Sequence, residues 1–162
     1  MQQRIKVNIC PMYPDVVIPK YQTRGSAGCD VRAYLKTKDN ETSMESAYRI
    51  TVGMRSVIIP TGLMFSVPEG YYIAIVPRSG MAAKTTMRIA NQPGTLDSDF
   101  TGELKIIVDN IGTRYDEEIV IQHQDRIAQL IFLPSYQADF NLVTKLSKTE
   151  RGSGGFGSTG TA

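Results

Sequence analysis

Residues 56–76 read SVIIPTGLMFSVPEGYYIAIV, and this stretch decides the fold. Three short apolar runs, at 56–59, 63–67 and 71–76, are separated by Pro and Gly residues. Runs of this length that are rich in Val, Ile, Phe and Tyr are typical of strands, and the Pro and Gly residues between them mark turns. The stretch therefore predicts three β-strands with short connections.

The same pattern continues toward both ends of the chain. Ile5 to Ile9 alternates apolar and polar residues with the period of a half-buried strand. Another strand is expected to begin near Cys29. Further strands are predicted at 103–108, 118–121, 127–133 and 140–143. Many short strands punctuated by Gly and Pro predict a sandwich or a closed barrel rather than an α/β sheet.

Helical signals are few. Residues 79–84 are predicted as one short helix, with Ser79 able to cap its first turn. Residues 36–48 are polar and irregular, and they are expected to form a surface loop or a marginal helix.

Length and composition limit the classes of function. A chain of 162 residues fits one domain, since domains usually span about 100–200 residues. Its 18 Lys and Arg residues nearly balance its 16 Asp and Glu residues, so direct nucleic-acid binding is not expected and any anion site must be local. No signal peptide or long apolar run is present, and a soluble, intracellular protein without a membrane partner is expected.

The single histidine and two isolated cysteines cannot supply a four-ligand zinc site. Cys10 and Cys29 are expected to be free thiols, with a disulfide between them as the less favoured alternative.

The C-terminal residues 151–162 read RGSGGFGSTGTA and cannot form a core element. Their glycines match the spacing of a dinucleotide-binding loop, but that loop needs a following helix, so this interpretation fails. Such composition is typical of a flexible end. Arg151 and Phe156 add another possibility, because a guanidinium can bind phosphate oxygens and a ring can stack on a base. The tail is therefore predicted to be mobile, and ordering around a nucleoside triphosphate is the alternative that these two side chains allow.

Two further segments carry polar groups at predicted turns. In residues 77–80, a strand delivers Arg78 to the start of the short helix, whose free N–H groups favour a phosphate. An ordinary strand-to-helix turn explains this segment equally well. In residues 91–103, Asp97 and Asp99 lie on one face if the chain is extended. One such carboxylate can act as a general base for water, although acids in turns are usually solvated capping groups.

Together with two other segments, these resemble the five motifs of the trimeric dUTP pyrophosphatase family. The matching stretches, in order, are AGCDVRA at 27–33, PRSG at 77–80, GTLDSDFTGE at 94–103, DRIAQLIF at 125–132 and RGSGGFGSTG at 151–160. The resemblance implies a jelly-roll-like β-barrel that assembles into a homotrimer. It also implies a barrel domain at 1–150 and an arm at 151–162 that closes over a neighbouring subunit's active site.

The resemblance further implies hydrolysis of dUTP to dUMP and diphosphate, which limits uracil incorporation into DNA and supplies dUMP for dTMP synthesis. By this resemblance, Asp97 is the general base that directs a water at the α-phosphorus, and Asp30 holds Mg²⁺ through water. Phe156 stacks on uracil. The other residues implied in substrate binding are Arg78, Ser79, Gly80, Asn91, Gly94, Thr95, Leu96, Phe100, Lys105, Gln129, Arg151, Gly157, Ser158 and Thr159.

One position departs from the family pattern, because Phe100 stands where a tyrosine is usual. The flat ring that packs on deoxyribose is kept and only the phenol is lost. Two rival functions remain open: a dCTP deaminase or bifunctional deaminase–pyrophosphatase of the same fold, and a nucleotide-binding or regulatory module without catalysis. The deaminase needs a catalytic glutamate on the strand that follows Phe100, and that strand reads LKIIVDN at 104–110.

Overall fold

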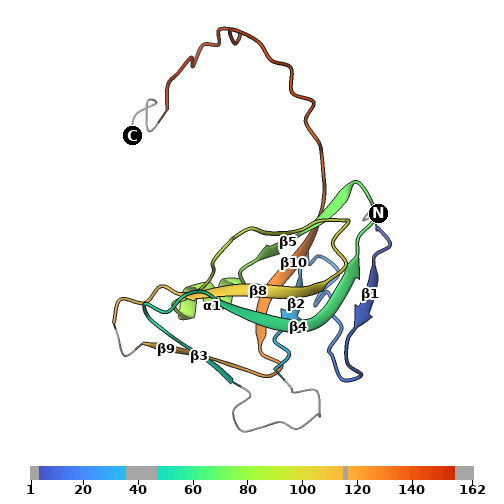
Figure 1. Ribbon diagram of the computed structural model, residues 1–162, viewed down its shortest axis with the longest axis vertical. Coiled ribbons are helices and arrows are strands. Elements are labelled where there is room, and N and C mark those ends of the chain that lie inside the picture. The colour runs from blue at the N-terminus through green and yellow to red at the C-terminus, as the bar shows by residue number, and fades with distance from the viewer. Residues whose placement is uncertain (1–3, 36–46, 115–116, 156–162) are drawn as a thin grey trace.

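The computed structural model describes residues 4–35, 47–114 and 117–155 (Figure 1). Its elements in chain order are β1 (Asn8–Pro11), β2 (Cys29–Arg32), β3 (Ala47–Thr51), β4 (Val57–Ser66), β5 (Tyr71–Val76), α1 (Ser79–Lys84), β6 (Met87–Ile89), β7 (Gly94–Leu96), β8 (Glu103–Asn110), β9 (Glu118–Gln122) and β10 (Arg126–Pro134). The predicted all-β fold with one short helix is confirmed.

The strands form two four-stranded sheets and one two-stranded ribbon. The first sheet has the order β1-β4-β8-β6, the second sheet has the order β2-β10-β5-β7, and the ribbon pairs β3 with β9. All of these pairings are antiparallel. In the part of the chain that the structure describes, the sheets remain two separate hydrogen-bonded units rather than one closed barrel.

Both sheets and the ribbon contribute side chains to one core. Along β8, Leu104, Ile106 and Val108 are buried, while the residues between them are more exposed, as expected for a strand with one face on a core. Facing residues from the second sheet, including Ile73 and Leu130, belong to the same cluster. This core fixes which face of the second sheet is left for a functional site.

β4 is one continuous strand where the sequence predicted two separate ones. Pro60 lacks an N–H and Gly62 has a positive φ of 67°, so the regular ladder to β8 is interrupted here. The Thr61 hydroxyl donates to the Leu104 carbonyl at 2.6 Å, and the Gly62 N–H donates to Glu103 Oε1 at 2.9 Å. Because these bonds satisfy the interrupted groups, the strand bends without ending.

Other predicted elements also need correction. β1 begins at Asn8 rather than at Ile5. The strand predicted at 140–143 is wrong: this segment has no strand partner, and Phe140 and Leu142 are 92% and 98% exposed. An apolar run becomes a strand only where another backbone edge can pair with it.

Three strands were missed, namely β3, β6 and β7. β3 starts at Ala47, within the stretch predicted as a loop or marginal helix, and the rest of that stretch, 36–46, lies outside the described residues.

The short helix is confirmed at Ser79–Lys84, but the predicted cap is wrong. Arg78 occupies the N-cap position and no side-chain hydrogen bond caps the helix. Ser79 is already the first helical residue, so its hydroxyl does not have the geometry of a capping group. Across the described ranges, no helix is long and apolar enough to cross a membrane.

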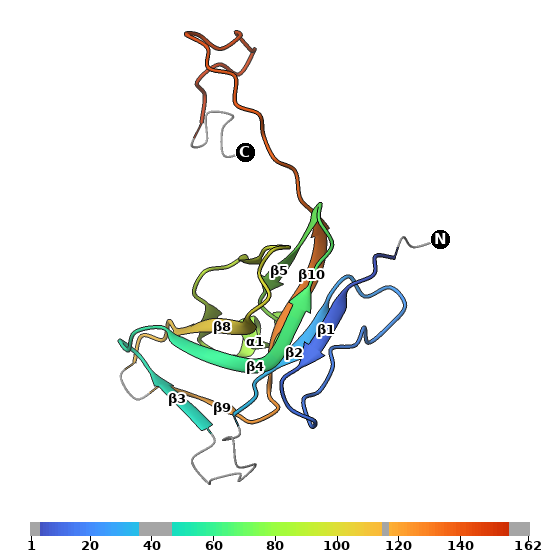
Figure 2. The same ribbon diagram turned by 45° about the vertical axis from the view of Figure 1, so that its right-hand side comes forward.

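Residues 135–155 form a C-terminal extension that leaves the end of β10 and runs away from the sheets in both views (Figures 1 and 2). The described residues of the extension contain neither helix nor strand. Its large apolar side chains are solvent-exposed in the single chain, with Tyr136 91% exposed and Leu146 88% exposed.

Candidate functional site

The second sheet aligns residues from three of the predicted motifs. Gln129, on the central strand β10, lies opposite Asp30 on β2 and opposite Val76 on β5. Arg78 follows Val76 by two residues and begins the turn into α1. The sheet therefore gathers Asp30, Arg78 and Gln129 at one end of β5, although they are far apart in the sequence.

Asp30 binds two arginines at this position. Arg78 Nε donates to Asp30 Oδ1 at 2.9 Å, and Arg126 Nη1 donates to Asp30 Oδ2 at 3.2 Å. The Asp30 side chain is only 12% exposed, whereas the Arg78 and Arg126 side chains are 23% and 43% exposed. Two partly exposed cations on a buried carboxylate leave guanidinium donors available to an anion.

Arg126 is not among the residues that the sequence motifs predict for the site. The available signal was its position directly before the strand that carries Gln129, in the stretch DRIAQLIF.

A β-bulge turns Arg126 toward Asp30. The β10–β2 register shifts between Arg126 and Ala128, which pair with Arg32 and Val31. Regular alternation from Gln129 would place residue 127 on the outer face and residue 126 inside. Instead, Ile127 and Ala128 are both buried, at 1% and 0% exposure, and Arg126 is exposed. The extra residue therefore aims the Arg126 side chain to the face that carries Asp30 and Gln129.

The predicted base pocket lies in the segment from β6 through β7. Gly94 pairs with Ile75 and is buried. A Cβ on Gly94 would lie 3.2 Å from Ile75 Cβ and 3.3 Å from Asn91 Nδ2. The glycine therefore allows the Asn91 amide to lie directly beside the β7 backbone, while Thr95 is exposed and Leu96 is buried.

Asp97 follows β7 and is exposed. Its carbonyl accepts a hydrogen bond from the Phe100 N–H at 3.3 Å, and a turn occupies Ser98 and Asp99. The extended arrangement that would place Asp97 and Asp99 on one face is therefore not formed. The Phe100 ring lies over Gly102, since a Cβ there would be 2.7 Å from Phe100 Cζ.

Within one chain, Asp97 lies far from the arginine pair. Leu96 pairs with Ile73, which precedes Val76 by three residues on β5. Three residues of strand span about 10 Å, and Asp97 lies beyond Leu96 in the opposite direction from Arg78. A single chain thus presents the arginine pair and Asp97 near opposite ends of β5.

The remaining predicted residues fall into three places. Ser79 and Gly80 are exposed in the first turn of α1, beside Arg78. Lys105 is on the first sheet, 51% exposed and 3.5 Å from Glu103 Oε2. Arg151 lies in the C-terminal extension, where its Nε donates to the Gly154 carbonyl at 2.8 Å. The predicted residues outside the described part of the chain are Phe156, Gly157, Ser158 and Thr159.

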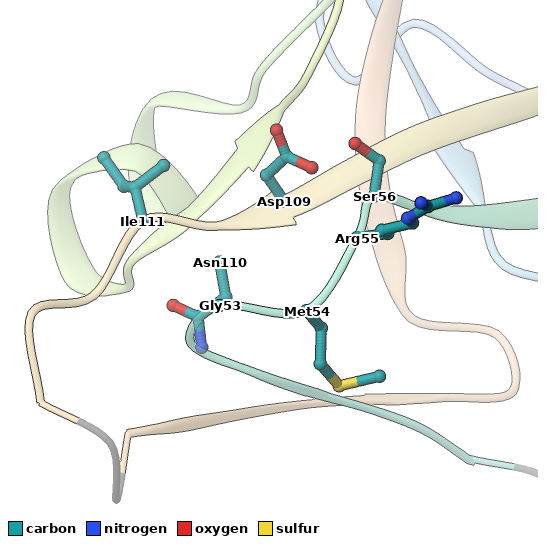
Figure 3. Close-up of a pocket in the computed structure, with 7 residues that line it drawn as sticks. All are labelled: Gly53, Met54, Arg55, Ser56, Asp109, Asn110 and Ile111. Atoms are coloured by element: carbon teal, nitrogen blue, oxygen red, sulfur yellow. The ribbon is translucent and has the colours of Figure 1, made fainter.

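Two surface hollows differ in their relation to this site. The larger, about 590 Å³, lies between the loop 53–56 and the end of β8 (Figure 3), where Arg55 and Asp109 are its charged residues. It contains none of the predicted site residues. The smaller, about 310 Å³, lies between α1 and the segment from β9 to the start of β10, and it includes both Arg78 and Arg126. The smaller cleft is therefore the one that belongs to the site.

The side chains at this site could contact a magnesium ion only through water. Within 4–35, 47–114 and 117–155, no group of three or more His, Cys, Asp or Glu residues could hold a metal ion. Mg²⁺ usually keeps several waters and is held by one or two carboxylates together with substrate phosphates. Asp30 is a lone carboxylate beside two arginines, and a contact to the ion through water is the only metal role that these residues allow.

Cys29, the residue before Asp30, is a buried free thiol. Burial, and then the negative charge of Asp30, raise the pKa of the Cys29 thiol from 9.0 to about 11. The thiol is therefore protonated at neutral pH and serves as a small core residue rather than as a nucleophile.

Comparison with known proteins places the whole chain in one family. The family model described as dUTPase matches residues 15–160. The deoxyuridine 5'-triphosphate nucleotidohydrolase of Bdellovibrio bacteriovorus is 48% identical over 145 residues, covering 90% of this chain and 89% of the relative. The protein of the same name from Fusobacterium nucleatum is 43% identical, covering 90% of each chain.

Solved structures share the fold at lower identity. The dUTPase of Staphylococcus bacteriophage 80alpha, with dUPNHPP, has a TM-score of 0.78 at 23% identity, covering 96% of this chain and 99% of that chain. A mutant dUTPase of phage phi11 of S. aureus, described with a structural Mg(II) ion, has a TM-score of 0.70 at 20% identity, covering 87% and 98%. The match over residues 15–160 and the identities of 43–48% over most of the chain establish that this chain belongs to the dUTPase family.

Proposed function

We propose that this protein hydrolyses dUTP to dUMP and diphosphate. The observation that carries the proposal is the arginine pair Arg78 and Arg126, held by Asp30 beside Gln129, in a chain of the dUTPase family. Partly exposed guanidiniums suit a polyphosphate, because their planar N–H groups match phosphate oxygens. The proposed role of this reaction in the cell is to limit uracil incorporation into DNA and to supply dUMP for dTMP synthesis.

In this proposal the segment from Asn91 to Leu96 binds the base, and Asp97 is the general base. Uracil presents O2 and O4 as acceptors and N3–H as a donor, so the Asn91 amide and the β7 edge can pair with it. Cytosine reverses this pattern at N3 and position 4, and it would leave polar groups unpaired. Asp97, exposed at the end of β7, accepts a proton from the water that attacks the α-phosphorus.

The proposed active form is a homotrimer whose sites are shared between subunits. In one chain, Arg78 and Asp97 lie near opposite ends of β5, so one chain cannot present both to a single phosphorus atom. In the trimer, Arg78 of one subunit and Asp97 of a neighbouring subunit would together form one site. Arg151 and the residues after it, from the C-terminal arm, would complete the site and exclude bulk water.

Magnesium, when bound, would neutralise charge on the phosphates and favour the conformation that is open to in-line attack. Asp30 is the residue proposed to hold it, through water, while Arg78 and Gln129 orient the phosphate oxygens. Phe100, over Gly102, is proposed to pack on deoxyribose.

Substrate identity is tested by a phosphate-release panel. The purified protein is incubated with dUTP, UTP, dTTP and dCTP, with and without Mg²⁺, and dUMP and diphosphate are quantified. We expect turnover with dUTP and Mg²⁺, and far less with the other three. Equal turnover of UTP and dUTP would remove the assigned role of Phe100, and absence of dUTP turnover would refute the proposed reaction.

The shared site is tested by mixing two inactive variants. Asp97→Asn should retain nucleotide binding and lose about 10²–10⁴-fold in turnover, which is the usual contribution of a general base. Arg78→Gln should lose phosphate binding. If the two halves come from different subunits, co-refolding both variants one to one should restore about a quarter of the wild-type sites. If activity does not return, both halves belong to one chain and the proposed sharing is wrong.

A deaminase acting on dCTP is the alternative with the same fold. It needs a free catalytic glutamate on the strand after Phe100. The only glutamate of β8, Glu103, accepts a hydrogen bond from the Gly62 N–H and lies 3.5 Å from Lys105 Nζ, so it is occupied in joining β4 to β8. Release of ammonia from dCTP would favour the deaminase over our proposal.

A further inference from the structure

We infer that Asp30 is a positioning residue, whose charge holds Arg78 and Arg126 together as one polyphosphate-binding pair. This role acts through the arginines and does not require a metal ion. It rests on the proposed function, since it concerns how the same site recognises its substrate. It also reaches beyond the role of metal holder that the sequence resemblance implies for Asp30.

The two oxygens of Asp30 have separate partners. Oδ1 accepts from Arg78 Nε at 2.9 Å and Oδ2 accepts from Arg126 Nη1 at 3.2 Å. Because the Asp30 side chain is only 12% exposed, water screens these contacts less than it screens surface ion pairs. The carboxylate is therefore a fixed anchor for both cations.

Arg78 and Arg126 reach this anchor from different elements, the N-cap position of α1 and the start of β10. Arg78 is the residue before α1, and its Nη1 lies 3.4 Å from the Arg126 carbonyl, which accepts from it. Arg126 reaches the same face only because of the β-bulge at Ile127. Two guanidiniums brought this close repel one another, and a carboxylate between them offsets that repulsion.

The two arginines keep donors for a ligand. Each guanidinium carries five N–H donors, of which Arg78 uses Nε and Nη1, and Arg126 uses Nη1, in the contacts above. Each side chain can therefore hold Asp30 and a phosphate at once. We therefore expect the pair to favour a ligand with more than one phosphate group.

Binding in the absence of metal separates this role from that of a metal holder. We would measure the affinity of the non-hydrolysable analogue dUpNHpp in EDTA for the wild type and for Asp30→Asn. A residue that acts only through Mg²⁺ should have no effect in EDTA. For such a residue, Asp30→Asn would remove a negative charge near the phosphates and should tighten the binding of dUpNHpp. If Asp30 positions the arginines, Asp30→Asn should instead weaken binding about tenfold or more.

A matched control comes from a second ion pair outside the site. Arg49 Nη1 lies 2.6 Å from Glu118 Oε2, joining β3 to β9. Glu118→Gln also replaces a carboxylate by an amide, and it should leave the affinity for dUpNHpp in EDTA unchanged. Thermal unfolding of both variants shows whether the fold is kept.

Arg126→Lys tests the inference independently of whether Asp30→Asn folds. Lysine keeps the charge but cannot hold a carboxylate and a phosphate with one planar group. We expect weaker binding of dUpNHpp in EDTA for Arg126→Lys, and little further loss when Asp30→Asn is added to it. Wild-type affinity of Arg126→Lys, or unchanged or tighter binding by folded Asp30→Asn, would overturn the inference. Turnover of dUTP by the wild type with Mg²⁺, measured alongside, reports on the proposed function separately.

Discussion

Gly28 lies beneath the side chain of Gln129, so that a Cβ at residue 28 would be 3.0 Å from Gln129 Oε1. The backbone of residue 28, just before β2, is therefore part of the surface on which the Gln129 amide rests. A methyl group at this position forces the amide to move.

We predict that Gly28→Ala displaces Gln129 and raises KM for dUTP about tenfold, with a smaller effect on stability. Steady-state kinetics with thermal unfolding checks this. Gly25→Ala is the matched control, because a Cβ on Gly25 has nothing within 4 Å. Unchanged KM in Gly28→Ala would mean that Gln129 does not contact the substrate from its present position.

Asn110 joins four backbone or side-chain groups at the end of β8. Its Nδ2 donates to the carbonyls of Ile50 at 2.9 Å and Glu117 at 3.0 Å, and its Oδ1 accepts from Thr86 Oγ1 at 2.7 Å and the Gly112 N–H at 3.0 Å. This amide therefore fastens the β3–β9 ribbon to the first sheet.

We predict that Asn110→Asp lowers the free energy of unfolding by about 2–4 kcal/mol, because a carboxylate cannot donate to the two carbonyls. Urea denaturation at neutral pH measures this loss. Asp109→Asn, the reverse change at the neighbouring residue, is the control and should cost little. Equal stability of Asn110→Asp and the wild type would show that the two carbonyls are satisfied in another way.

Gly62 combines a left-handed backbone with crowding. Its φ is 67°, and a Cβ would lie 2.8 Å from Val16 Cγ2 and 3.3 Å from Tyr34 Cγ. Gly70 has a φ of 82° with nothing within 4 Å of its Cβ position. Both glycines therefore have a left-handed backbone conformation, but only Gly62 has close neighbours at its Cβ position.

We predict that Gly70→Ala costs about 1–2 kcal/mol of stability from backbone strain alone. Gly62→Ala should cost about 1–3 kcal/mol more, because the methyl group overfills a packed site. Chemical denaturation of both variants gives the difference directly. If the two losses are equal, the side chains of Val16 and Tyr34 move away without cost.

The two thiols should differ in reactivity. Cys10 is exposed, whereas Cys29 is buried and its pKa is raised to about 11. At pH 8, a thiol reagent should label one cysteine per native chain and two per denatured chain. Rapid labelling of both in the native state would contradict the burial of Cys29.

The raised pKa of Cys29 also gives a pH dependence with a defined sign. The thiol ionises near 9.0 when unfolded and near 11 when folded. Its contribution to stability is therefore fully present below pH 9 and is lost as the pH rises from 9 to 11. Cys29→Ala should reduce this part of the decline in the free energy of unfolding between pH 9 and 11.

Removal of residues 151–162 should separate folding from catalysis. The last core strand, β10, ends at Pro134, so the truncated chain should unfold at nearly the wild-type temperature. Turnover of dUTP should fall about tenfold or more, because a closing arm completes the site and excludes water. Normal turnover by the truncated protein would refute the role of the arm.

Much of the fold follows from local sequence, because short apolar runs rich in β-branched and aromatic residues between turn residues favour strands. This pattern predicted β5, β8, β9 and β10 closely. It failed where partners decide the structure. β6 and β7 have three residues each and exist because β8 and β5 present edges to them. The apolar run at 140–143 has strand composition but no edge to pair with in the described chain.

The site was predicted unevenly for a similar reason. The resemblance to family motifs suggested Asp30, Arg78 and Gln129 as site candidates, and the antiparallel register of β2, β10 and β5 brings these three residues together. Sequence order alone could not reveal that Asp97 lies toward the other end of β5. That separation depends on β7 running antiparallel to β5, with Leu96 opposite Ile73.

The β-bulge in β10 makes the length of that strand as important as its composition. A chain that lacked residue 127 would pair regularly with β2 and would keep Arg126 on the outer face, but it would lose the buried Ile127 side chain from the core. A chain one residue longer would have to place a second extra residue against the same short partner. Insertions and deletions that loops tolerate would therefore be selected against in this strand, even if every remaining side chain were kept.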